Sequence, residues 1–308
     1  MQNDRIYRRL AEQIPAGRLI PDCDMRMHTT FKAGGKAALF VLVENREELG
    51  HALNVLSDSS VAHMVVGNGS NILVTDAGYA GVLIKLGGSL AAVAVADTGE
   101  DVIVAGAGAL LSEVAKEAMD RGLSGLEFAF GIPGTVGGAL YMNAGAYGNE
   151  MRDVVESVEV LAADGKHAHQ VITAAALEWG YRSSALQQTG DVVIGATLRL
   201  APGDPVEIKG RVRELTQKRN AAQPLALPSA GSFFKRPEGF FAGKLIQDAG
   251  LKGVRIGDAR VSPQHAGFIV NEGTATAADI IDLMHLIQNT VLDKFGVSLA
   301  PEVQIIGE

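Results

Sequence analysis

Cysteine and aromatic residues are scarce in this sequence of 308 residues. The one cysteine, Cys23, excludes a disulfide within the chain and any zinc or iron–sulfur site built from several thiolates. Aromatic side chains make up only 5% of the residues. The seven histidines are scattered without the spacing of metal ligands, so the sequence predicts no metal site.

The sequence also has no long hydrophobic run and no excess of positive charge, and its first residues are not expected to form a leader segment. The longest apolar run spans residues 90–96, whereas a membrane-spanning helix needs about 20 apolar residues. Residues 1–14 mix charged and apolar side chains without the apolar centre of a signal peptide. The net charge of −8 argues against nucleic acid or anionic lipid as the main partner. We therefore expect a cytoplasmic protein with no nucleic-acid or membrane partner, although a basic pocket can still bind a small anion.

Glycine, in contrast, is abundant, with 37 residues. The first glycine-rich segment follows a predicted strand at residues 61–66 and consists of Gly67, Asn68, Gly69, Ser70 and Asn71. Backbone amides in such a segment can bind a phosphate. Asn and Gly are also the preferred residues of a tight hairpin turn, and the pentapeptide alone favours that alternative. The dinucleotide-binding pattern GxGxxG is excluded because Ile72 occupies the third glycine position.

The second glycine-rich segment, residues 131–148, contains six glycines. Thr135 can cap a short helix whose backbone N–H groups face a pyrophosphate. Gly137 and Gly138 weaken that helix, as expected if a bulky ligand lies against it. The alternative is a glycine-rich crossover packed beneath another element, but the density of glycines favours a ligand.

Three further segments contain side chains suited to chemistry. Residues 231–237 place a serine between a glycine and two phenylalanines, followed by Lys235 and Arg236, which can bind phosphates. Taken alone, this heptapeptide favours an ordinary strand with a basic end, and the lack of a His or Asp at nucleophile-elbow spacing argues against a serine hydrolase. Residues 181–184 and 299–303 contribute an arginine and a glutamate that, by themselves, are typical of surface charges.

Short strands and helices are mixed on both sides of a boundary near residue 203, where Pro202 and Pro205 interrupt regular structure. This order predicts an α+β fold rather than the regular alternation of a doubly wound sheet. Helices are expected at residues 47–57, 111–121, 206–220 and 240–249.

The C-terminal region predicts a long helix followed by a strand. Thr276 begins the helix, with Asp279 three residues later as in a capping box. A strand is expected at residues 297–306. The apolar stripe of the helix consists of Ile280, Met284, Ile287, Val291 and Phe295, and Gly296 ends it.

Taken in order, these segments resemble the UDP-N-acetylenolpyruvoylglucosamine reductases, the flavoenzymes that complete UDP-N-acetylmuramate in bacterial cell-wall synthesis. The resemblance runs from the His-Thr-Thr-Phe segment at residues 28–31 to the Pro-Glu-Val segment at residues 301–303. It implies an FAD-binding fold of the vanillyl-alcohol-oxidase (PCMH) type in two lobes and a C-terminal α+β substrate-binding domain. The short spacing between Arg182 and Ser232 is similar to that of the shorter subclass, which lacks an extra tyrosine-bearing substrate loop.

The sequence pattern and the resemblance together predict a division into domains. Residues 1–30 are expected, from their pattern alone, to form an N-terminal helix and connector. The FAD-binding domain spans residues 31–203, with lobes at about 31–97 and 98–203, and the substrate-binding domain spans residues 204–308.

The same resemblance implies the site residues. Arg182, Ser232 and Glu302 lie where the family has its catalytic side chains. The residues implied to bind FAD noncovalently are Gly67, Asn68, Gly69, Ser70, Asn71, Gly131, Ile132, Gly134, Thr135, Gly137, Gly138, Asn143, Ala144, Gly145 and Ala146. Those implied to face the UDP-sugar are Lys235, Lys244, His265 and Asn271.

The implied reaction is the reduction of UDP-N-acetylglucosamine enolpyruvate, with NADPH as the hydride donor and FAD as the carrier. In this reading Arg182 binds the substrate carboxylate and Ser232 protonates the carbanion that forms. We expect a monomer. Two alternatives are an oxidase of the same flavin-binding superfamily and a nucleotide-sugar sensor without turnover.

Overall fold

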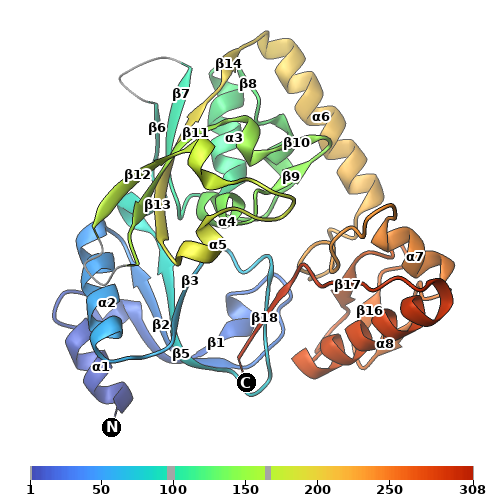
Figure 1. The fold of residues 1–308 in the computed structure, drawn as a ribbon, viewed down its shortest axis with the longest axis horizontal. Coiled ribbons are helices and arrows are strands. Elements are labelled where there is room, and N and C mark those ends of the chain that lie inside the picture. Colours follow the sequence, from blue (N-terminus) through green and yellow to red (C-terminus); the bar gives the residue numbers. More distant parts are fainter. Residues whose placement is uncertain (1, 96–100, 164–167, 308) are drawn as a thin grey trace. The chain divides into compact units, whose positions relative to one another are not determined.

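A computed structural model describes residues 2–95, 101–163 and 168–307 (Figure 1). The chain folds into two compact units, each assembled from three separate stretches. Unit 1 comprises Met1–Pro21, Leu39–Gly67 and Gly81–Gln217. Unit 2 comprises Asp22–Ala38, Asn68–Ala80 and Lys218–Glu308. Both units are discontinuous, whereas the domains expected from the sequence are continuous stretches.

The regular elements are mostly short, and many strands have only two or three residues. The helices are α1 (Gln2–Leu10), α2 (Arg46–Asp58), α3 (Leu111–Asp120), α4 (Val136–Tyr141), α5 (Leu186–Thr189), α6 (Pro205–Ala222), α7 (Ala242–Asp248) and α8 (Ala277–Phe295). The first nine strands are β1 (Leu19–Asp24), β2 (Lys36–Val43), β3 (His63–Val66), β4 (Ile72–Val74), β5 (Tyr79–Leu86), β6 (Val93–Val95), β7 (Val102–Gly106), β8 (Leu123–Ser124) and β9 (Gly145–Ala146). The others are β10 (Asn149–Glu150), β11 (Val155–Leu161), β12 (His169–Thr173), β13 (Val192–Arg199), β14 (Ala201–Pro202), β15 (Arg255–Ile256), β16 (Ala259–Val261), β17 (Ile269–Asn271) and β18 (Gln304–Ile306).

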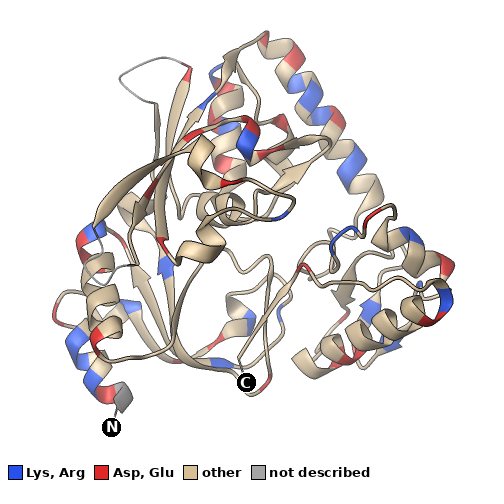
Figure 2. Cartoon of the chain, in the orientation of Figure 1, with Lys and Arg blue, Asp and Glu red and all other residues tan. Residues whose placement is uncertain are grey.

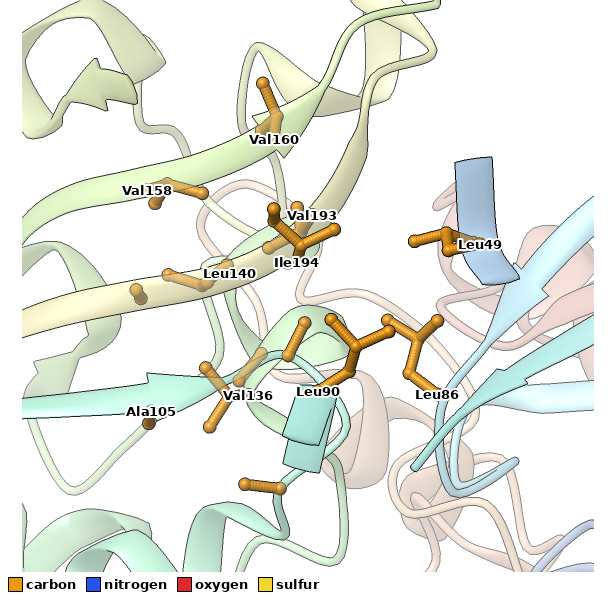
Figure 3. Close-up of a cluster of buried hydrophobic side chains, with 14 of the residues drawn as sticks. Leu49, Leu86, Leu90, Ala105, Val136, Leu140, Val158, Val160, Val193 and Ile194 are labelled. Atoms are coloured by element: carbon orange, nitrogen blue, oxygen red, sulfur yellow. The ribbon is translucent and has the colours of Figure 1, made fainter. Parts of the chain in front are cut away.

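Unit 1 is built on an antiparallel sheet in the order β12-β11-β13-β7-β6 (Figure 1). A second sheet has the order β1-β2-β5-β3, in which β3 and β5 are parallel. The core of the unit lies between these sheets and helices α2, α3 and α4. Figure 3 shows Val136 and Leu140 of α4 in the same buried cluster as Val193 and Ile194 of β13. Packing against this cluster fixes α4, which is too short to be stable by itself.

The long helix α6 is largely charged outside its buried stripe. Figure 2 shows several Lys and Arg residues along it. Its buried residues are Ile208, Val212 and Leu215, which recur at the three- to four-residue spacing of one helix face. None of the helices in the described ranges combines the length and apolar character that crossing a bilayer requires.

Unit 2 contains the antiparallel sheet β15-β16-β17, the parallel pair β4–β18, and helices α7 and α8. Its core includes Phe31 and Phe233, whose rings meet edge to face at 6.1 Å between centroids. Helix α8 begins as predicted, with Thr276 and Asp279 forming a capping box. The carboxylate of Asp76 accepts hydrogen bonds from the N–H groups of Ala277 (2.9 Å) and Ala278 (2.8 Å), which occupies two more donors of the first turn.

Three expectations at the C-terminal end need correction. The last strand is only Gln304–Ile306, because residues 297–303 follow an irregular path against other loops. Phe295 does not belong to the buried stripe, since its side chain is 40% exposed at the end of α8. Helix α7 starts at Ala242, two residues later than expected, so Phe240 and Phe241 precede it and are exposed.

Candidate functional site

The first and second glycine-rich segments meet within unit 1. Thr135 is 4% exposed and caps α4, because its hydroxyl accepts a hydrogen bond from the Gly138 N–H at 3.4 Å. Gly67, at the end of β3, lies directly against this cap. A Cβ added at Gly67 would lie 2.4 Å from Thr135 Oγ1, so only glycine lets the two segments approach this closely.

The adjacent glycines of α4 have different environments. A Cβ at Gly137 would lie 3.1 Å from the Cβ and 3.2 Å from the carbonyl oxygen of Ala107, and the Gly137 N–H donates to that oxygen at 2.8 Å. A Cβ at Gly138 would have only Thr135 Oγ1 near it, at 3.6 Å. Gly137 therefore serves the packing of α4, whereas Gly138 leaves an exposed stretch of backbone that side chains do not cover. Such a backbone surface fits a flavin nucleotide, which needs close approach to amide groups.

This difference predicts distinct outcomes for two valine substitutions. Gly138→Val is expected to give a folded protein that has lost most of its flavin colour, because the new side chain projects into the uncovered space. Gly137→Val is expected to lower the melting temperature as well, because the side chain meets Ala107. Absorbance at the flavin band and thermal unfolding of the purified variants measure the two effects. Gly210→Val is the matched control, since a Cβ there, in α6, meets nothing within 4 Å. Full flavin occupancy in Gly138→Val would contradict a cofactor at this position.

The hairpin alternative for residues 67–71 is wrong. The strand before the segment, β3, pairs with β5, and the strand after it, β4, pairs with β18, so the two flanking strands are not partners of one another. Gly69 has a φ of +63°, and a Cβ there would lie 2.2 Å from the carbonyl oxygen of His28. The Gly69 carbonyl also accepts a hydrogen bond from the Thr30 N–H at 3.2 Å. Substitution of Gly69 therefore disturbs the backbone of unit 2 itself and cannot serve as a selective probe of cofactor binding.

The structure places Arg182 beside the second glycine-rich segment, within unit 1. Its Nη2 donates to the carbonyl oxygen of Gly145 at 3.4 Å, and its guanidinium lies 5.1 Å from the ring centroid of Tyr181. Asn143 is fully buried and its Nδ2 donates to the carbonyl of Gly180 at 3.0 Å. The arginine that looked like an isolated charge in the sequence is thus fixed against residues implied to bind FAD.

In unit 2, Ser232 and Glu302 lie on adjoining chain segments. The Phe233 N–H donates to the carbonyl of Gly267, and the Phe233 carbonyl accepts from the Glu302 N–H, both at 2.8 Å. The Lys235 N–H continues the pattern by donating to Ala300 at 2.9 Å. The segment at residues 232–235 is therefore held between two other segments, with only isolated bridges in place of the ordinary strand that the heptapeptide favours.

Asn71 joins the first glycine-rich segment to Glu302. Its Nδ2 donates to the Glu302 carbonyl at 3.1 Å, and its own carbonyl accepts from the Gln304 N–H at 2.9 Å. The cause is the parallel pairing of β4 with β18, in which Ile72 lies opposite Gln304. Parallel strands start at the same edge, so Asn71, directly before β4, and Glu302, two residues before β18, come together.

The four residues implied to face the UDP-sugar have unlike environments. Lys235 is half-buried at the end of the segment that begins with Ser232. Lys244 is exposed, and its Nζ lies 2.5 Å from Asp248 Oδ1. Asn271 is 1% exposed, and its Nδ2 donates to the Phe31 carbonyl at 3.0 Å while its Oδ1 accepts from the N–H groups of Gly273 (3.0 Å) and Ala275 (3.1 Å). Both ends of the Asn271 amide thus serve the backbone of unit 2.

His265 is the remaining member of that set. Burial lowers the pKa of its imidazole, which favours the neutral ring. Its Nδ1 lies 3.1 Å from the Gly267 nitrogen and accepts that N–H, so the neutral ring carries its proton on Nε2. A neutral imidazole can donate a hydrogen bond to a ligand but adds no positive charge to a phosphate site.

Two side chains to which the sequence analysis gives no role, Ser184 and Gln187, hold the Arg182 turn. Ser184 Oγ donates to the Tyr141 carbonyl at 3.0 Å, and Gln187 Nε2 donates to the same oxygen at 2.8 Å. No periodic pattern marks Gln187, because α5 is only four residues long. Within residues 2–95, 101–163 and 168–307, no three His, Cys, Asp or Glu side chains gather closely enough to hold a metal ion.

Comparisons with known proteins bear on this arrangement. Residues 37–170 match a protein-family model described as an FAD binding domain, and residues 223–306 match one described as UDP-N-acetylenolpyruvoylglucosamine reductase, C-terminal domain. The UDP-N-acetylenolpyruvoylglucosamine reductase of Alkaliphilus oremlandii is 45% identical over 308 residues, covering 100% of both chains. That of Caldanaerobacter subterraneus is 47% identical, covering 97% of each.

A solved structure is also similar over nearly the whole chain. The UDP-N-acetylenolpyruvylglucosamine reductase of Thermus caldophilus matches with a TM-score of 0.79 and 38% identity, covering 94% of this chain and 98% of that one. Together with the family matches, this confirms the predicted α+β fold with an FAD-binding domain, and FAD as the cofactor.

Proposed function

Because the chain belongs to the UDP-N-acetylenolpyruvoylglucosamine reductase family, we propose that it reduces UDP-N-acetylglucosamine enolpyruvate to UDP-N-acetylmuramate with NADPH. FAD, which we propose is held noncovalently by the glycine-rich segments, would supply the two-electron chemistry that the reduction requires. The observation that carries the proposal is the pairing of Ser232 with Glu302 on hydrogen-bonded segments, next to Asn71 of the first glycine-rich segment.

Arg182 is proposed to bind the carboxylate of the enolpyruvyl group. Addition of hydride to the double bond places negative charge on the adjacent carbon, and this charge spreads into the carboxylate. A guanidinium presents two parallel N–H donors to a carboxylate, and fixed donors of this kind stabilise developing charge without reorganisation. The contact of Arg182 with Gly145 restricts where its guanidinium can lie.

Ser232 is proposed to donate the proton that completes the reduction. The residue is exposed, while the following Phe233 and Phe234 are buried and anchor the backbone next to it. A serine hydroxyl is a weak acid, so its contribution depends on strict positioning. Glu302, in its protonated form, is proposed to stabilise the developing charge by donating a hydrogen bond.

Colour changes of the flavin test the proposed reaction. The purified protein is expected to be yellow, to be bleached by NADPH in the absence of oxygen, and to recover its colour on addition of UDP-N-acetylglucosamine enolpyruvate. Acid precipitation is expected to release the flavin, as noncovalent binding requires. Rapid oxygen consumption with an alcohol substrate, or flavin retained in the acid pellet, would indicate an oxidase instead. A colourless protein that still binds the UDP-sugar would indicate a sensor.

Lys235 is proposed to bind the UDP phosphates, and this predicts a selective effect on substrate affinity. Lys235→Ala is expected to raise the apparent KM for the UDP-sugar about 10- to 100-fold, the typical value of a hydrogen bond to a charged group. Bleaching of the flavin by NADPH is expected to proceed normally. Steady-state and stopped-flow kinetics measure the two effects, with Lys36→Ala, an exposed lysine of the same unit, as the control. An unchanged KM would show that Lys235 does not bind the UDP-sugar and only ends its segment.

The protein is further proposed to act as a monomer in the cytoplasm, where its nucleotide substrates are found. Size-exclusion chromatography with light scattering is expected to give the mass of one chain, 32.2 kDa, plus the flavin.

A further inference from the structure

The backbone of Arg182 has an unusual conformation. Its φ is +55°, in the left-handed region, which costs an L-amino acid about 1 kcal/mol or more. The residue lies in a tight turn in which Gly180 and Ser183 exchange backbone hydrogen bonds of 3.0 and 3.3 Å. A strained turn of this kind persists only where surrounding groups hold it in place.

Gln187 supplies one of these groups. Its Nε2 lies 3.2 Å from the Arg182 carbonyl and 2.8 Å from the Tyr141 carbonyl, so one side-chain amide donates to both. Tyr141 is the last residue of α4, where carbonyl groups lack partners within the helix. The same amide lies 3.7 Å from Met142 Sδ. Gln187 therefore ties the main chain of Arg182 directly to the end of the helix in the second glycine-rich segment.

The opposite side of the turn is held by Asn143. Its Nδ2 donates to the carbonyl of Gly180 and to Glu150 Oε2, each at 3.0 Å, and its Oδ1 accepts the Arg152 N–H at 3.1 Å. The turn is thus attached to residues 141–143 at both ends. Among these contacts, the hydrogen bond from Gln187 Nε2 is the one that reaches the main chain of Arg182 itself.

We propose that Gln187 is a positioning residue for the reduction, which sets the direction of the Arg182 guanidinium by holding its main-chain carbonyl. This proposal rests on the proposed function through the role of Arg182. Without the amide, Tyr141 keeps its hydrogen bond from Ser184, but the Arg182 carbonyl loses its link to α4. The strained turn can then relax, and displacement of a binding group by about 1 Å can cost about 100-fold in rate.

The test compares two neighbouring glutamines of one helix. Gln187→Met keeps the length of the side chain and removes its donors, and Gln188→Met makes the same change at an exposed position. Gln187→Met is expected to weaken binding of the UDP-sugar to the oxidised protein, measured by calorimetry without turnover. It is also expected to slow recolouring of the flavin by substrate about 10- to 100-fold, with flavin content and bleaching by NADPH unchanged. Gln188→Met is expected to match the wild type in every measurement.

A double-mutant cycle separates positioning from a purely structural role. In an Arg182→Ala background, Gln187→Met is expected to cause no further loss, because the group that it positions is gone. Equal slowing of both half-reactions, a full additional loss in the Arg182→Ala background, or behaviour like that of Gln188→Met would overturn the proposal. If Gln187→Met does not fold, Gln187→Glu takes its place in the cycle, since it keeps a polar side chain while removing both donors.

Failure of the proposed function would give other results than failure of the Gln187 proposal. In that case Arg182→Ala would itself leave substrate binding and recolouring unchanged, or the wild-type protein would not turn over the UDP-sugar at all.

Discussion

Replacing Ser232 with alanine is expected to slow the transfer from flavin to substrate by about 10²- to 10⁴-fold, the range typical of a positioned general acid. Bleaching by NADPH is expected to keep its wild-type rate, because the serine acts only after hydride has reached the substrate. The substitution removes one hydroxyl from an exposed side chain, and Phe233 continues to hold the segment through its bonds to Gly267 and Glu302. Folding and flavin content are therefore expected to survive. Stopped-flow measurement of the two half-reactions checks the result.

Two further variants control this prediction. Ser229→Ala removes a hydroxyl three residues away in the same unit and is expected to leave both half-reactions unchanged. Ser232→Cys keeps a transferable proton and is expected to recover part of the second half-reaction. If the second half-reaction runs at the wild-type rate in Ser232→Ala, or if both halves slow equally, the hydroxyl only shapes the site.

The largest effect on stability is expected from Arg18. Its guanidinium makes two hydrogen bonds to the Glu48 carboxylate, at 2.7 and 2.8 Å, and lies 3.1 Å from Glu44 Oε2. The Arg18 and Glu48 side chains are only 17% and 11% exposed. Arg18→Met leaves the Glu48 carboxylate buried without its counter-charge, and we expect a loss of about 2 kcal/mol in the free energy of unfolding. The value is smaller than that of a fully buried pair because both side chains keep some contact with water.

Chemical denaturation of the flavin-loaded protein at neutral pH measures this loss. Arg26→Met is the matched control, because Arg26 pairs with Asp24 on the surface and its side chain is 63% exposed. That variant is expected to unfold like the wild type. If both substitutions lower the free energy of unfolding equally, the Arg18–Glu48 pair stabilises the protein no more than the exposed Arg26–Asp24 pair does.

The same pair predicts a dependence on pH. Burial raises the pKa of the Glu48 carboxyl, but hydrogen bonds from Arg18 and from the Glu44 N–H outweigh it, so the pKa lies below its usual range. A carboxyl whose pKa is lowered by folding stabilises the protein above its unfolded-state pKa, about 4.3, and loses this contribution as the pH falls through the folded-state pKa. The difference in stability between the wild type and Arg18→Met is therefore expected to shrink below about pH 4.3. A difference in stability between the two proteins that stays constant down to pH 3 would contradict this prediction.

The sequence by itself determined those features that depend on near neighbours in the chain. Thr276 and Asp279 cap one another within a single turn, and Gly296 and Gly122 adopt φ values of +68° and +70° at helix ends. These interactions span at most four residues, so the predicted boundaries of α8 and α3 agree closely with the structure. The α+β class follows from the mixed order of short strands and helices, and the family follows from several separated motifs that occur in one order.

Only the tertiary structure decided what individual side chains within those motifs do. Gly137 and Gly138 are neighbouring glycines that the sequence cannot tell apart. In the structure Ala107 packs against Gly137 and leaves Gly138 uncovered. Asn71 reaches Glu302 across 231 positions because two parallel strands start at one edge, and no local pattern records that pairing. Gln187 and the buried amides of Asn143 and Asn271 likewise take their partners from distant segments. The physical reason is that a polar side chain binds whichever donor or acceptor the folded chain places within about 3 Å, and long-range pairing alone sets that placement.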